Sequence, residues 1–340
     1  MSTTGPLRVA CIGMGWWSDV LADAIQRSGK LTILSCYTRS EEKRKSFAAK
    51  YRCRPPAASY EAMLADGEIE AIINTTPNDV HLATTCVAAA AGKHVFLDKP
   101  IANTISDGRA ITEACRKAGV VLALGYQRRR ENHFRWIRQQ IDNGLFGKLV
   151  NAEANISRDR LGKIDLASWR YQAKGMPGGV MLQIGIHYID VLEYLIGPIR
   201  AVRGQLARLV LPGDNPDVAS LMLEHGNGAL STLNASYASA SEYYLMNIYG
   251  RDATAYYDLH NGLRLLKRGE SAPVAIPCAK NDTLVEELEE FAAAVRGQGR
   301  HEVGGEYATR SLAVVRAGIL SAREGRRVEV AEILDSDRNL

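Results

Sequence analysis

The sequence predicts two domains: an N-terminal α/β domain with a doubly wound parallel sheet, and a C-terminal α+β domain with a large, mostly antiparallel open sheet. In the first part of the chain, short apolar strands alternate with helical segments. After Lys148, strand-like segments follow one another without intervening helices. We therefore expect one domain over residues 1–125 and a second over residues 126–340, whose last helices could pack back on the first.

Composition excludes several classes of protein. The chain has 340 residues, 46% of them hydrophobic and 24% charged, which is ordinary for a soluble protein with two domains. The net charge of +4, without an aromatic-basic stripe, argues against a nucleic-acid partner. Six cysteines lack metal-ligand spacing, so we expect no metal site and reduced thiols in the cytoplasm. Neither an export signal nor an apolar run of the ~20 residues that span a membrane is expected.

The first predicted strand covers residues 7–12 and leads into the turn Gly13-Met14-Gly15-Trp16-Trp17-Ser18, followed by a helical pattern. Strand, glycine turn and helix form the arrangement that binds dinucleotides. The first glycine permits the turn, and the second lets the backbone approach a pyrophosphate at the helix N-terminus. Ser18 replaces the usual third glycine and is small enough for close helix–strand packing. We predict that Gly13, Gly15, Trp16 and Trp17 contact a dinucleotide.

The second predicted strand, residues 31–37, ends in Thr38-Arg39-Ser40. In NAD-binding folds an acidic residue near this point binds the ribose 2′-hydroxyl. Here the first acidic residue is Glu41, whereas a guanidinium between two hydroxyls suits a 2′-phosphate. Alternatively, Arg39 stacks on the adenine. The pattern favours NADP over NAD as the cofactor.

Three more polar segments follow predicted strands of this domain. Helices are expected over residues 43–51 and 60–64, and the strand 71–74 runs into Thr75-Thr76-Pro77-Asn78. After a helix over residues 79–91, the strand 94–97 leads to Asp98-Lys99-Pro100. Ligands bind beyond the carboxyl ends of parallel strands, where Gly15, Thr76, Asn78 and Lys99 would lie. Lys99 could be a surface lysine, but its place between a strand and a proline favours a functional role.

In the second domain, alternating apolar patterns predict a succession of strands. They cover residues 149–156, 201–211, 219–224, 229–237, 244–249, 253–258 and 263–267. Asn227-Gly228 is a hairpin signal between two of them. Two amphipathic helices, over residues 284–295 and 308–322, are expected to close the chain. A sheet of this kind with one uncovered face usually needs a partner.

A helix is predicted over residues 179–196, opened by Gly178-Gly179 and ended by Gly197-Pro198. Its polar side chains recur at i, i+4, i+7 and i+11, which places them on one helix face. They are Gln183, His187, Asp190 and Tyr194. The remaining faces are apolar and should be buried. The stripe is either a set of structural hydrogen bonds or part of a site.

These segments together resemble the Gfo/Idh/MocA oxidoreductase family, the relatives of glucose-fructose oxidoreductase and inositol dehydrogenase. The family's "ATPN…H…AGKHV…EKP" block is similar to residues 75–78, His81, residues 91–95 and residues 98–100. Its "GFNRRF" block resembles residues 125–130, and its "GGG…DxGxHxxD" helix resembles residues 178–190. The final segment 321–328 is also similar. The resemblance therefore runs nearly from end to end.

The resemblance implies an NAD(P)-dependent dehydrogenase of a secondary alcohol on a sugar, sugar derivative or cyclic polyol. Residues 1–125 would bind the dinucleotide, and residues 126–340 would bind substrate and form a homodimer or homotetramer through the sheet. The implied catalytic residues are Lys99, His187 and Gln183. The implied cofactor contacts beyond those above are Pro77, His81, Asp98, Lys99 and Gln127. The implied substrate contacts are Arg129, Trp169, Arg170, Gln183 and His187.

The chain departs from the family at Gln183, where the family has an aspartate. An amide cannot exchange protons, so Gln183 could only orient the substrate or the histidine. We expect His187 to be the general base and Lys99 to polarise the hydroxyl. Two alternatives remain, a dehydrogenase of aromatic dihydrodiols and a dinucleotide-binding regulator that has lost catalysis.

The segment from Arg158 to Arg170 is rich in hydrogen-bond donors and aromatic residues. It could frame a hydroxylated or anionic substrate, or it could be a solvated loop anchored by Trp169. Among the three consecutive arginines, the resemblance places Arg129 near the site, whereas Arg128 and Arg130 could be surface charges.

Overall fold

The computed structural model describes residues 5–163, 165 and 167–336. The chain divides into two compact units. Unit 1 comprises the described residues of Met1–Gln127 and Asp282–Thr309, and unit 2 those of Arg128–Asn281 and Arg310–Leu340. Among the described residues, none of the helices is both long enough and apolar enough to cross a membrane.

Unit 1 contains a five-stranded sheet in the order β2-β1-β3-β4-β5. Its strands are β1 (Leu7–Ile12), β2 (Leu31–Tyr37), β3 (Ala71–Asn74), β4 (His94–Asp98) and β5 (Leu122–Gly125). Every pairing is parallel, which confirms the predicted doubly wound sheet. The carboxyl ends of all five strands therefore lie at one edge, where polar turns can meet a ligand.

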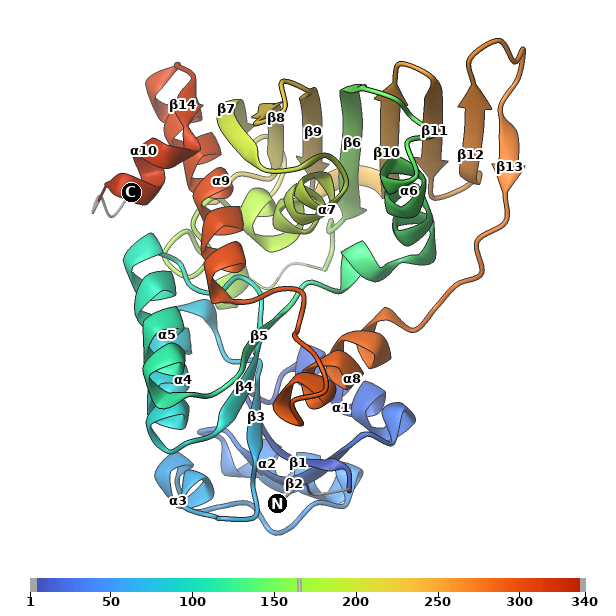
Figure 1. The fold of residues 1–340 in the computed structure, drawn as a ribbon. Helices are drawn as coiled ribbons and strands as arrows, with labels where there is room; N and C mark the ends of the chain where they lie inside the picture. Colours follow the sequence, from blue (N-terminus) through green and yellow to red (C-terminus); the bar gives the residue numbers. More distant parts are fainter. Residues whose placement is uncertain (1–4, 164, 166, 337–340) are drawn as a thin grey trace. The chain divides into compact units, whose positions relative to one another are not determined.

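The helices of unit 1 cover both faces of this sheet (Figure 1). They are α1 (Trp16–Ser28), α2 (Glu41–Tyr51), α3 (Tyr60–Leu64), α4 (His81–Ala90), α5 (Ile105–Ala118) and α8 (Thr283–Val295). Apolar side chains of α1, α2 and α8 share one core with β1 and β4. Within it, the ring of Phe291 meets that of Phe96 edge-on at 5.7 Å between centroids. The helix predicted over residues 79–91 begins later, because a 3-10 turn, Asn78–Val80, precedes α4.

Unit 2 contains a nine-stranded sheet in the order β13-β12-β11-β10-β6-β9-β8-β7-β14. Its strands are β6 (Leu149–Asp159), β7 (Ile199–Ala207), β8 (Val218–His225), β9 (Leu230–Ser236), β10 (Ala238–Gly250), β11 (Ala253–Asp258), β12 (Gly262–Lys267), β13 (Val274–Ile276) and β14 (Val328–Glu329). The β6–β9 pair is parallel and the others are antiparallel, as predicted. The hairpin predicted at Asn227-Gly228 joins β8 to β9.

One predicted strand is shorter in the structure. We expected it to continue to Leu211, but β7 ends at Ala207. The carboxylate of Asp217 accepts hydrogen bonds from the backbone N–H groups of Leu209, Val210 and Leu211, at 2.9, 2.8 and 2.6 Å. These donors are turned toward one carboxylate and cannot continue the ladder with a neighbouring strand.

The helices of unit 2 are α6 (Asn132–Asp142), α7 (Ile186–Ile196), most of α9 (Gly305–Glu324) and α10 (Val330–Asp335). Helices α6 and α7 lie over one face of the sheet (Figure 1). Residues of β6 that face this side, such as Ala154 and Ile156, are fully buried. On the other face Met222 is 61% and Leu230 is 53% exposed. Within the described part of the chain, this second face has no helical layer.

Candidate active site

The glycine turn after β1 contains Gly13 and Gly15, and a different physical reason explains why each position is a glycine. Gly13 has φ +85°, and a Cβ there would lie 2.6 Å from backbone atoms of Thr75 and Thr76. The fold itself therefore requires a glycine at this position. Gly15 has φ −114° and ψ 178°, which any residue can adopt, and a Cβ there would meet nothing within 4 Å. The chain alone gives no reason for Gly15, whereas a ligand that approaches the backbone does.

The N-terminus of α1 is arranged to receive an anion. Gly15 is the N-cap and offers no side chain to the N–H groups of the first turn. These donors and the positive end of the helix dipole are the features that bind phosphate at helix N-termini. Ser18 is buried at 2% exposure, in agreement with its expected role as a small packing residue. The predicted contacts Trp16 and Trp17 are the first residues of α1, and Trp16 is 59% exposed.

The turn after β3 is held by its own hydrogen bonds. The Thr75 hydroxyl donates to the carbonyl of Gly13 at 2.7 Å, which ties this turn to the glycine turn. The backbone N–H and hydroxyl of Thr76 both donate to the amide oxygen of the fully buried Asn74, at 3.1 and 2.7 Å. Thr76 and Pro77 are thereby fixed at the ligand-binding edge of the sheet.

His81 was predicted to contact the cofactor, and the structure places it beneath the turn. Its ring is 1% exposed, with Nε2 2.9 Å from the carbonyl oxygen of Thr76 and Nδ1 3.0 Å from that of Pro100. Burial lowers the pKa of His81, and the hydrogen bonds to backbone carbonyls oppose that change. The imidazole thus joins the turn after β3 to the segment after β4. Asn78, also buried, donates from Nδ2 to Oδ1 of Asn103 at 3.2 Å.

The remaining predicted residues of unit 1 lie at the same edge of the sheet. Asp98 is the last residue of β4, and the half-buried Lys99 follows it. Gln127, two residues beyond β5, is also half-buried. Because β1, β3, β4 and β5 are successive neighbours, the structure brings these groups and the glycine turn to one edge.

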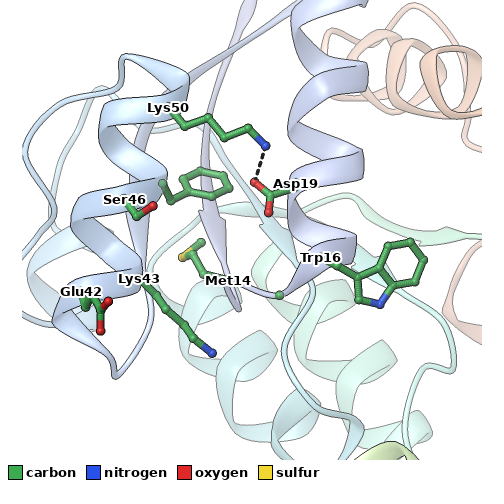
Figure 2. A pocket seen from close by; sticks show the side chains of 9 residues that line it. Met14, Trp16, Asp19, Glu42, Lys43, Ser46 and Lys50 are labelled. Atoms are coloured by element: carbon green, nitrogen blue, oxygen red, sulfur yellow. Dashed lines mark hydrogen bonds and ion pairs between the residues drawn. The ribbon is translucent and has the colours of Figure 1, made fainter. Parts of the chain in front are cut away.

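A hollow of about 490 Å³ lies between the glycine turn and α2 (Figure 2). Its lining consists of Met14, Gly15, Trp16, Asp19, Glu42, Lys43, Ser46, Phe47 and Lys50. Lys50 is neutralised by Asp19, with 2.9 Å between Nζ and Oδ1. Lys43 extends from the first turn of α2 toward Met14 (Figure 2). Lys43 was not among the cofactor contacts predicted from the sequence. The helix dipole disfavours a cation in the first turn of a helix. A lysine at this position was therefore a signal in the sequence for a nearby anion that compensates this cost.

The tripeptide after β2 has partly structural roles. The Thr38 carbonyl accepts a hydrogen bond from Nη1 of Arg44 at 2.6 Å, and Arg44 also lies over the ring of Tyr37 at 5.3 Å. The Ser40 hydroxyl caps α2 by accepting from the N–H of Lys43 at 3.3 Å. Arg39 is exposed. Lys43, in the first turn of α2, is exposed as well.

In unit 2, the predicted helix begins with a wide turn. Gly179 has φ +49°, and a Cβ there would lie 2.3 Å from the Pro216 carbonyl oxygen, so the entry needs glycine. Met181–Gly185 form a π-helical turn before α7, an irregularity that is frequent at functional sites. Gln183 lies in this turn and is half-buried, and His187 in the first turn of α7 is 7% exposed.

The second half of the polar stripe binds arginines of the same unit. Asp190, fully buried, accepts from Nε of Arg129 at 3.1 Å through both oxygens and also from Nη2. Arg135 donates to the hydroxyl of Tyr194 at 2.9 Å, and the guanidinium of Arg129 lies 5.2 Å from the centre of its ring. The stripe therefore divides into an arginine-binding half and a half with Gln183 and His187.

Trp169 and Arg170 lie in a 3-10 turn, Trp169–Tyr171, and both are half-buried. The guanidinium of Arg170 stacks on the Trp169 ring, 4.5 Å from its centre. Ile164 and Leu166, in the same predicted segment, lie outside the described residues.

Both units match one protein family. Residues 7–126 match the domain described as "Oxidoreductase family, NAD-binding Rossmann fold", and residues 134–256 match the GFO/IDH/MocA C-terminal domain. The chain belongs to the Gfo/Idh/MocA oxidoreductase family. Its first domain is therefore an NAD(P)-binding Rossmann domain, as predicted.

Members of the family with known names include several sugar and polyol enzymes. The chain is 29% identical to 1,5-anhydro-D-fructose reductase of Ensifer adhaerens over 59% of either chain. It is 27% identical to D-apiose dehydrogenase of Paraburkholderia graminis over 80% of this chain and 76% of that enzyme. Among solved structures, a candidate NADPH-dependent oxidoreductase of Desulfitobacterium hafniense has 32% identity and a TM-score of 0.92, with 98% and 100% of the two chains covered.

Proposed function

We propose that this protein is an NAD(P)-dependent dehydrogenase or reductase acting on a secondary alcohol of a sugar, sugar derivative or cyclic polyol. The observation that carries the proposal is Gly15, a glycine for which the fold has no need and a dinucleotide does. The substrate class is supported by the named relatives, which include a reductase of an anhydro sugar and dehydrogenases of apiose and myo-inositol.

The nicotinamide cofactor, when bound, accepts hydride from the carbinol carbon or returns it to the carbonyl. We assign the matching proton to His187, which would take it from the hydroxyl as general base. Lys99 would polarise and position that hydroxyl through its ammonium group. Gln183 would hold a second hydroxyl of the substrate, since an amide can both donate and accept hydrogen bonds. Arg129, paired with Asp190, would fix the position of the helix.

We also propose a preference for NADP. Arg39 and Lys43 offer two solvent-facing cations near the glycine turn, and a 2′-phosphate carries the charge that they would neutralise. Pro77, Asn78 and Asp98 would line the cofactor site, and His81 would support it from below. Gln127 would lie at its nicotinamide end.

Turnover experiments separate this function from its alternatives. A panel of sugars, inositols and sugar derivatives, with NADP and NAD, is scored by nicotinamide absorbance. Reduction with a sugar or polyol supports the proposal. Turnover of aromatic dihydrodiols alone favours the second enzyme class. Dinucleotide binding without turnover of any compound indicates a regulator.

We further propose domains over residues 1–125 and 126–340, with residues 282–309 of the second packed into the compact unit of the first, and a homodimer or homotetramer formed through the uncovered sheet face. Met222 and Leu230 would be buried there. Met222→Asp should then lower the mass measured by light scattering while the far-UV spectrum stays unchanged. A cytoplasmic location is proposed as well, supported by the six cysteines, all of which are free thiols.

A further inference from the structure

Three adjacent strands of unit 2, β9, β6 and β10, have polar side chains within or directly after them on the face that α7 covers. Ala154 and Ile156 of β6 are fully buried on this face, and Ile156 pairs with Ala235 of β9 and Tyr244 of β10. Side chains alternate between faces along a strand, so Arg158 continues the buried row of β6. Tyr237, two residues after Ala235, continues the row of β9. The apolar floor beneath the helix is thus bordered by Arg158, Tyr237 and Tyr244.

The hydroxyl of Tyr237 is buried and lies within the electrostatic influence of three arginines. This side chain is 3% exposed, and its hydroxyl has no hydrogen-bond partner within the described residues. Burial raises the pKa of Tyr237, and the charges of Arg158, Arg160 and Arg170 oppose that rise. Arg160 is held in place by its backbone N–H, which donates to the Tyr237 carbonyl at 3.0 Å. The positive charges of three arginines therefore act on one buried phenol.

The cluster carries more positive than negative charge. Across residues 5–163, 165 and 167–336, neither Arg158 nor Arg160 forms a side-chain ion pair, and the Nε of each is buried without an acceptor. The nearby carboxylates are used elsewhere: Asp159 accepts from the N–H of Leu161 at 2.9 Å, and Glu242 accepts from the Tyr244 hydroxyl at 3.1 Å.

Arg128 lies over the same tyrosine ring as Arg158 but, unlike Arg158 within the described part of the chain, is paired with a carboxylate. Its guanidinium lies over the Tyr244 ring at 4.5 Å, as that of Arg158 does at 5.8 Å, but Arg128 is paired with Glu131 at 3.0 Å. Partly buried cations without counter-charges are costly, and an anionic ligand would remove that cost.

The cluster is connected to the helix that carries Gln183. The N–H of Tyr237 donates to the carbonyl of Asp217 at 2.8 Å. The preceding carbonyl, that of Pro216, accepts from the N–H of Val180 at 3.2 Å, at the start of the π-helical turn. An anion held by the arginines would thus lie on the Gln183 side of the helix.

We propose that Arg158, Arg160 and Arg170, together with the Tyr237 hydroxyl, bind an oxyanion carried by the sugar or polyol substrate, either a carboxylate or a phosphate. Guanidinium groups match both anions with paired N–H donors, and the phenol supplies a further donor. The proposal rests on the proposed function and narrows its substrates to sugar acids or sugar phosphates.

The first test compares D-glucose, D-glucuronate and D-glucose 6-phosphate as ligands of the cofactor-loaded enzyme by calorimetry, with turnover in parallel. At least one charged probe should bind at least tenfold more tightly than the neutral sugar. The charged probe with the higher affinity then shows whether the site prefers a carboxylate or a phosphate. Equal affinity for all three probes, or no binding of either charged probe, overturns the oxyanion site. Charged probes that bind without any turnover on the full panel instead count against the proposed function alone.

Two variants test whether Arg160 and the Tyr237 hydroxyl cause the tighter binding of the charged probe. Arg160→Gln should weaken the charged probe about ten- to hundredfold and leave the neutral sugar unchanged, whereas Arg203→Gln, an exposed arginine of β7, should change neither. Tyr237→Phe removes only the hydroxyl and should weaken the charged probe about three- to tenfold without lowering Tm. Parallel losses for charged and neutral ligands would contradict the assignment and indicate a structural role.

Discussion

The glycine turn of unit 1 and the polar stripe of unit 2 both look uniform in the sequence, and both divide in the structure. In the turn, Gly13 is required by its backbone angle and by the approach of β3, whereas Gly15 has open space beside it. In the stripe, Asp190 and Tyr194 bind arginines, whereas Gln183 and His187 lie at the start of the helix. The turn therefore combines a glycine that the fold needs with one that it does not, and the stripe combines two residues that bind arginines with two at the start of the helix.

This difference gives a criterion for function. A residue whose type is explained by its own backbone angles or by its neighbours needs no ligand to account for it. A residue such as Gly15, whose type the fold leaves unexplained and which caps a helix directly after a parallel strand, points to a ligand. Substitutions that separate stability from binding or turnover test the criterion.

The largest effect is expected at the two glycines. Gly15→Val should abolish dinucleotide binding, because its side chain would occupy the path of the pyrophosphate, and leave Tm unchanged, because the site is open. Gly13→Ala is the matched variant. It should lower Tm, since its Cβ would lie 2.6 Å from backbone atoms of Thr75 and Thr76. Thermal unfolding and cofactor titration measure the two effects. Normal cofactor affinity in Gly15→Val would contradict the proposal that the glycine turn of unit 1 binds the dinucleotide.

Turnover separates the proposed catalytic residues. His187→Ala should lower kcat by ~10²–10⁴ and remove the acidic limb of the rate profile, since a histidine base ordinarily titrates near about pH 6.5. Lys99→Ala should also lower kcat but keep that limb, because a lysine that only polarises the hydroxyl does not set it. The pH dependence of kcat is the measurement. Should the limb persist in the histidine variant and disappear in the lysine variant, the two roles must be exchanged.

The free energy of unfolding tests the other half of the stripe, in which Asp190 binds Arg129. Asp190→Asn leaves the Arg129 guanidinium buried without its carboxylate and should cost about 3–5 kcal/mol of unfolding free energy. The double variant Asp190→Leu/Arg129→Met should recover much of that loss, because no buried charge remains. Chemical denaturation gives both numbers. A variant Asp190→Asn that is stable but inactive would place Asp190 with His187.

The sequence was sufficient for the parallel sheet, the antiparallel sheet and the glycine turn, because each depends on a local period or on residues adjacent in the chain. It could not divide the stripe, because helical spacing gives the face of Asp190 but not the arginine that it meets 61 positions away. It predicted His81 as a cofactor contact, but it could not predict that the ring also joins the carbonyls of Thr76 and Pro100, which lie far apart along the chain. It overlooked Lys43, whose relevance depends on the approach of α2 to the glycine turn.

The smallest effect is expected at the 2′ position of the cofactor. Arg39→Ala and Lys43→Ala should each weaken NADP about ten- to hundredfold, or about 1.5–3 kcal/mol, because each removes a charge-assisted contact to the phosphate. NAD affinity should change far less. Lys45→Ala is the matched control, since Lys45 lies on the same helix, pairs with Glu41 at 2.7 Å and does not line the hollow. Fluorescence titration through Trp16 and Trp17 measures both cofactors in each variant. Equal losses of NADP and NAD in Arg39→Ala would show that Arg39 stacks on the adenine, and the selectivity would then rest on Lys43.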